Sequence, residues 1–176
     1  MNITFQDLII LYPLIFLAGF VDSIAGGGGL ISLPAYLFVG LPSHNALATN
    51  KLSSTIGTIF STLRYAKGRA IIYLVALPSV VWSLIGSHIG ARLTLVLSDN
   101  ILKLVLAFLI PLAAVIVLLA NPRKERTLAV KNISKTRVVV VSGVIGLTIG
   151  TYDGFFGPGT GTFLIILYVS FLSLDH

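Results

Sequence analysis

The run Gly19-Phe-Val-Asp22-Ser-Ile-Ala-Gly26-Gly-Gly-Gly29 decides how the first part of this chain folds. Four successive glycines disfavour a helix, because each costs about 1 kcal/mol relative to alanine. They interrupt an apolar block from Leu8 to Gly40, which exceeds the roughly 20 residues of one simple membrane span. We therefore predict two half-helices, over residues 8–23 and 30–39, joined by a non-helical glycine loop.

The same pattern recurs 131 residues further along the chain. Gly150-Thr-Tyr-Asp153 aligns with Gly19-Phe-Val-Asp22, and the same offset aligns Gly157 with Gly26. Each aspartate precedes a glycine loop by four residues inside an apolar block, which indicates an internal repeat. We divide the chain into a first repeat over residues 1–120, a basic loop over 121–137, and an incomplete second repeat over 138–176.

The composition indicates a membrane protein. Hydrophobic residues make up 56% of the chain and charged residues 10%, with a mean hydropathy of +0.99, whereas soluble domains carry about 25% charged residues. Further apolar segments run over residues 43–67, 70–97, 101–120 and 138–174. The predicted fold is all-α, a polytopic transmembrane helical bundle. There is no cysteine, so disulfides and thiolate metal sites are excluded.

The basic residues predict the orientation. Arg123–Arg137 holds six basic residues and one acidic residue, so the positive-inside rule makes this loop cytoplasmic. If the first broken block is a re-entrant hairpin, three crossings follow it and the second repeat is inverted. This is the plan of many secondary transporters, whose sites lie at broken helices. Counting the block as one kinked span reverses the parity, so both readings stay open.

Glycine loops at membrane depth leave backbone N–H groups that need a partner. Such donors, together with the positive end of the following helix, favour an oxyanion. The predicted binding residues are Gly26, Gly27, Gly28 and Gly29 in the first loop and Gly157, Gly159, Thr160 and Gly161 in the second. The alternative is that the glycines only let helices pack closely.

Polar side chains near these loops extend the candidate site. Asp22 and Asp153 are carboxylates in apolar blocks, where a charge is costly; they organise the loops or carry a coupling proton. We predict that Thr49, Asn50 and Lys51 line the route of the anion. The alternative for Lys51 is that its long side chain extends to the membrane interface. His44 and His88 are read as packing or interface residues, and Gly86 with Gly90 as a helix-contact pair. The Ser43 hydroxyl is a predicted helix cap.

These residues resemble a known family. Gly19–Pro34, the following His44–Lys51 and the second copy Gly150–Gly161 are similar to the paired signature of the sulfite exporter TauE/SafE family. The resemblance covers essentially the whole chain. It implies a multi-pass permease of the bacterial inner membrane that moves sulfite, thiosulfate or organosulfonate anions. Family members are longer, so we expect a C-terminally truncated chain.

The functional prediction is a secondary-transporter-type permease that exports small sulfur oxyanions by alternating access at the broken half-helices. The alternative is a non-transporting membrane subunit, or a truncated remnant of such a permease. We predict no enzyme activity, because no catalytic constellation stands out, and no cofactor or metal ion. The expected partners are the anion and the lipid bilayer and not nucleic acid, and the sequence is compatible with a homo-oligomer.

Overall fold

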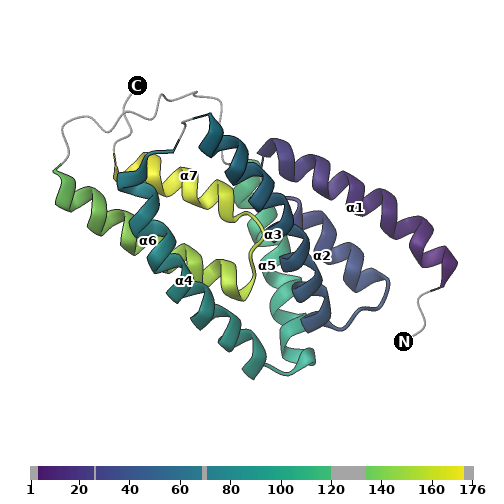
Figure 1. Cartoon of the computed structure of the whole chain (residues 1–176). Coiled ribbons are helices and arrows are strands. Elements are labelled where there is room, and N and C mark those ends of the chain that lie inside the picture. The colour runs from purple at the N-terminus through teal and green to yellow at the C-terminus, as the bar shows by residue number, and fades with distance from the viewer. Residues whose placement is uncertain (1–3, 26, 69–70, 120–133, 173–176) are drawn as a thin grey trace.

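A computed structural model describes residues 4–25, 27–68, 71–119 and 134–172, and within these ranges the predicted all-α fold is confirmed (Figure 1). The helices are α1 (Phe5–Ala25), α2 (Gly29–Phe38), α3 (Ser43–Lys67), α4 (Tyr73–Val96), α5 (Asp99–Leu119), α6 (Lys135–Phe155) and α7 (Thr160–Phe171). Gly26 and most of the basic loop over 121–137 lie outside the described residues.

Four of the described helices are long and apolar enough to cross a membrane. They are α1 as far as Ser23, α4, α5 and α6, whereas α2 and α7 are shorter apolar helices. The expected half-helix over 8–23 is therefore wrong in its length, because α1 has 21 residues. The helix continues through Asp22 to Ala25, and Gly27 is the next described residue and is not helical.

The two broken blocks have matching helix boundaries. Shifting α1 and α2 by the sequence offset of 131 puts their first residues at 136 and 160. The observed α6 and α7 begin at Lys135 and Thr160. The offset of 131 thus relates the starts of the two helix pairs to within one residue. The inverted relation between them and the repeat limits remain predictions.

The main core lies where α2, the start of α3 and α5 meet. Leu33 and Leu102 are fully buried there, and Phe156 from the turn after α6 joins them. This core fixes the start of α3 between the two glycine loops. The later part of α3 differs, because every residue from Leu52 to Lys67 is exposed.

α4 and α6 lie side by side along one edge of the molecule (Figure 1) and pack through small residues. A Cβ atom added to Gly146 would lie 2.6 Å from the Ser79 carbonyl oxygen, and one added to Gly86 would lie 2.8 Å from the Thr151 nitrogen. A Cβ on Gly90 would meet the Thr151 carbonyl oxygen. Glycine is required for this approach, and the predicted Gly86–Gly90 contact face is confirmed.

The predicted Ser43 cap is wrong. The hydroxyl of Ser43 is buried, and no described group hydrogen-bonds to it. The backbone N–H of Ser43 instead donates to Asp99 Oδ1 at 2.6 Å, so a carboxylate from the start of α5 caps α3. A carboxylate suits this position because it complements the positive end of the helix dipole.

Candidate functional site

The two glycine loops meet beside Asn50 and Lys51 of α3. A Cβ atom added to Gly29 would lie 2.9 Å from Pro158 Cγ and 3.2 Å from Asn50 Nδ2. A Cβ on Gly157 would lie 2.8 Å from Lys51 Nζ. Parts of both predicted repeats are thus in contact at one place, where bulkier residues would hold them apart.

Asp22 organises the first loop. Its Oδ1 atom accepts hydrogen bonds from the backbone N–H groups of Gly27 and Gly28, each at 2.9 Å. Gly28 has an ordinary helical φ of −54°, but a Cβ there would meet the Ala18 carbonyl and lie 2.7 Å from Asp22 Cβ. Glycine is needed for close approach, and the two amides point at a carboxylate of the same chain.

The second loop has a different backbone requirement. Gly157 and Gly159 have φ values of +97° and +82°, which L-residues with a side chain rarely adopt. The Tyr152 hydroxyl donates to the Pro158 carbonyl at 2.7 Å and fixes the turn from inside. The loops therefore share a sequence pattern but use their glycines for two different physical reasons.

Lys51 and Asp153 form an ion pair between α3 and α6. Lys51 Nζ lies 2.9 Å from Asp153 Oδ2 and also donates to the Asp153 backbone carbonyl. The other carboxylate oxygen, Oδ1, accepts a hydrogen bond from the Thr160 hydroxyl at 2.9 Å. The two side chains are 30% and 41% exposed, so the pair can be reached from the surface of the chain.

Asn50 ties α3 to the first loop block. It is 9% exposed, and its Oδ1 atom accepts a 2.6 Å hydrogen bond from the hydroxyl of Ser32 on α2. Sequence reasoning missed Ser32, because a single serine in an apolar helix carries no distinguishing pattern. This bond fixes the position of α3 at the residue before Lys51.

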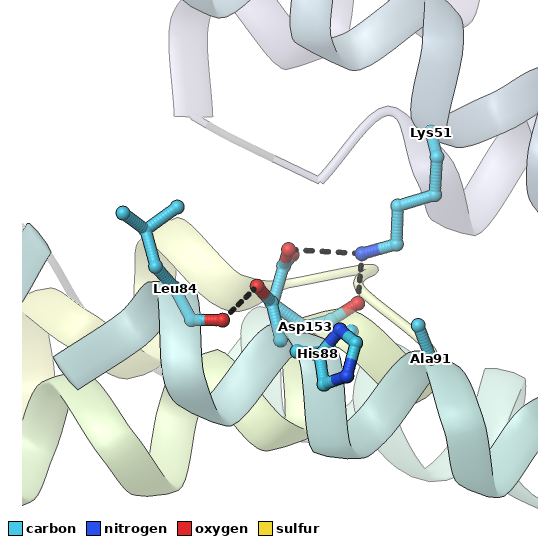
Figure 2. Close-up of a pocket in the computed structure, with 7 residues that line it drawn as sticks. Lys51, Leu84, His88, Ala91 and Asp153 are labelled. Atoms are coloured by element: carbon cyan, nitrogen blue, oxygen red, sulfur yellow. Dashed lines mark hydrogen bonds and ion pairs between the residues drawn. The ribbon is translucent and has the colours of Figure 1, made fainter. Parts of the chain in front are cut away.

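An open cleft of about 470 Å³ lies against the ion pair, between α3, α4 and α6. Figure 2 shows Lys51 reaching toward Asp153, with His88 and Ala91 on the α4 wall. The lining residues are Lys51, Leu84, Ser87, His88, Ala91, Asp153 and Gly154. An ammonium, a carboxylate and an imidazole in one cleft can bind a small anion and exchange a proton.

The remaining predicted site residues are not all at this centre. Thr49 and Gly161 are exposed and do not line the cleft, and Gly26 lies outside the described residues. His88 lines it although its sequence favoured a packing role. A lone histidine in an apolar helix gives no sequence signal of what it faces, so only the fold could identify it.

Comparison with known proteins identifies the family. The family model for the sulfite exporter TauE/SafE matches residues 11–176. The chain is 36% identical to "Probable membrane transporter protein ORF9" of Sinorhizobium sp over 169 residues, which are 96% of this chain and 63% of that protein. It is 35% identical to a "Probable membrane transporter protein" of Haemophilus influenzae, over 99% of this chain and 67% of that protein.

A third relative is "Probable membrane transporter protein YfcA" of Escherichia coli K12, which is 31% identical over 95% of this chain and 64% of that protein. The chain thus spans about two thirds of the length of these curated relatives. No solved structure matches it. The match to the family model covers nearly the whole chain and both glycine loops, and the chain belongs to the TauE/SafE sulfite exporter family.

Proposed function

We propose that this chain carries the substrate site of a permease that moves small sulfur oxyanions, such as sulfite or thiosulfate, across the inner membrane of a bacterium. The single observation that supports it best is the Lys51–Asp153 ion pair at the meeting point of the glycine loops. Charged side chains among apolar helices are costly and typically mark a substrate or ion route. The family name supports sulfite as the substrate class.

Lys51 is the residue that would recognise the anion. Its ammonium already holds one carboxylate oxygen of Asp153 at 2.9 Å, so an oxyanion can take over the same donor. Binding then requires that Asp153 leave Lys51, either by displacement or by protonation. The site then has two states, one in which Lys51 holds the Asp153 carboxylate and one in which it holds the substrate anion. Alternating access requires two such states.

The glycine loops play a supporting role in this mechanism. The Gly27 and Gly28 amides already donate hydrogen bonds to Asp22. The anion would therefore bind to the Lys51 ammonium in preference to these backbone donors. The loops let the two helix pairs approach closely and move as units. Opening the contact between Gly29 and Pro158 would expose Lys51 to the other side of the membrane. The family name favours export as the direction of transport.

Flux in proteoliposomes tests this function. We would measure sulfite and thiosulfate uptake for this chain, for a version extended to the length of its relatives, and for both with Lys51→Met. Lys103→Met is the matched control, because Lys103 pairs with Asp99 and does not line the cleft. We expect flux with the Lys103 variant and loss of flux with the Lys51 variant. Equal flux in both variants would contradict the proposal.

A non-transporting membrane subunit is the second candidate function. The exposed part of α3 favours it, because Leu52, Ile56 and Phe60 are 66%, 52% and 70% exposed beside a row of serine and threonine residues. A helix of this composition is expected to face protein or water rather than lipid alone. Absence of flux from both chain lengths, across a panel of oxyanions, would favour this reading.

A further inference from the structure

The α4 wall of the cleft contains a histidine that the proposed mechanism has not yet used. Leu84, Ser87, His88 and Ala91 line the cleft with the spacing i, i+3, i+4, i+7, which places them on one face of a helix. His88 is exposed. Within the part of the chain that the structure describes, no residue forms a hydrogen bond or an ion pair with its ring.

Two charged groups from other helices line the same cleft as His88. Lys51 comes from α3 and Asp153 from α6, and both line the same cleft as the imidazole (Figure 2). On α4 itself, Arg92 follows one turn later but does not line the cleft. When an anion replaces Asp153 on Lys51, the ring of His88 is the remaining group in the cleft that can gain a positive charge.

The small-residue packing of α4 on α6 holds the histidine in place. Gly86 and Gly90 are buried against α6, two residues on either side of His88. Because 100° separates successive residues of a helix, His88 lies on the side of α4 that faces away from this contact. The α6 backbone therefore fixes the position of the α4 wall, from which His88 lines the cleft.

We propose that His88 is the proton-binding half of the anion site, so that a small oxyanion binds between the Lys51 ammonium and a protonated His88 imidazole. This inference rests on the proposed function. Histidine is the side chain whose charge ordinarily changes between pH 5 and 8. Anion binding then takes up one proton at the imidazole, and the proton offsets one negative charge in apolar surroundings. No covalent bond changes in this step.

Thiosulfate binding to the purified chain in lipid nanodiscs, measured between pH 5 and 8, tests the proposal. Thiosulfate is the probe because its own charge is constant over this range, whereas sulfite takes up a proton within it. We expect the affinity of the wild-type chain to fall by at least about fivefold as the pH rises, which is the lower end of the usual coupling between two linked ligands.

Three variants separate the outcomes. His88→Gln should bind weakly at every pH, and His88→Lys, with a permanent charge, should bind tightly at every pH. His44→Gln is the matched control. His44 lies at the start of α3 and does not line the cleft, and its ring contacts the Thr94 carbonyl and the Asp99 carboxylate. This variant should keep the full pH dependence. The His88→Lys variant also guards against the case in which His88→Gln merely fails to fold.

Two results would overturn the inference in distinguishable ways. If His88→Gln keeps the wild-type pH dependence while Lys51→Met loses binding, His88 is not the proton site and the proposed function stands. If the wild-type chain binds no thiosulfate at any pH and the extended chain transports no oxyanion, both the inference and the proposed function fail.

Discussion

Lys51 of α3 is ion-paired with Asp153 of α6 at 2.9 Å, although 102 residues separate them in the chain. The pair joins the helix that follows the first glycine loop to the carboxylate that precedes the second. It is therefore a contact between the two predicted repeats. A movement of one repeat relative to the other must stretch or break this ion pair, so substitutions at Lys51 and Asp153 test the mechanism directly.

The contribution of this pair to stability should be small compared with its effect on flux. Asp153 is 41% exposed, and solvent-exposed ion pairs typically contribute 0.2–1 kcal/mol. A double-mutant cycle with Lys51→Met and Asp153→Asn should therefore give a coupling free energy of about 1 kcal/mol or less, measured by thermal unfolding in detergent. A coupling of several kcal/mol would instead indicate a structural pair.

Asp22 should act as a hydrogen-bond acceptor in the folded state. Asp22→Ala removes the acceptor from the Gly27 and Gly28 amides, and we expect it to lower the free energy of unfolding by about 1–3 kcal/mol. Asp22→Asn keeps one acceptor oxygen and should cost less. Thermal unfolding of both variants in the same detergent checks this order. Equal melting temperatures would show that the loop does not depend on this side chain.

The contact between α4 and α6 should be intolerant of a single methyl group at Gly90. A Cβ there would meet the Thr151 carbonyl and lie 2.6 Å from the Phe155 nitrogen. Overpacking of this kind typically costs 1–3 kcal/mol, so Gly90→Ala should lower the melting temperature. Gly57→Ala is the matched control, because no atom lies within 4 Å of its Cβ position. Alanine is the better helix former there, by about 1 kcal/mol, so this variant should be stabilised.

The second loop should be sensitive to the backbone conformation of Gly157. Its φ of +97° is strained for residues with a side chain, which costs about 1–3 kcal/mol. An added Cβ would also lie 2.8 Å from Lys51 Nζ and displace the ammonium. Gly157→Ala should therefore lower both stability and anion flux. Gly19→Ala, in open space within α1, should leave the flux unchanged and, like Gly57→Ala, should not lower the stability, because alanine is the better helix former. The melting temperature and the initial flux of each variant provide the comparison.

The helices and their breaks follow from the sequence. The predicted segment over residues 43–67 coincides with α3, Ser43–Lys67, and the offset of 131, applied to the observed starts of α1 and α2, gives the starts of α6 and α7 to within one residue. These features depend on local causes, namely the apolar length of a segment, the helix-breaking effect of glycine and the recurrence of a motif. A single sequence contains all three.

The partners of individual side chains were decided by the tertiary structure. Asp99 rather than the Ser43 hydroxyl caps α3, Lys51 meets Asp153, and His88 enters the cleft. The sequence placed Lys51 on a helix but left it free to snorkel to the interface, because no pattern within α3 encodes a carboxylate 102 residues away. Which groups of distant helices meet depends on how closely their backbones approach, and here the glycines of α4, α6 and the two loops set that distance only once the whole bundle has packed.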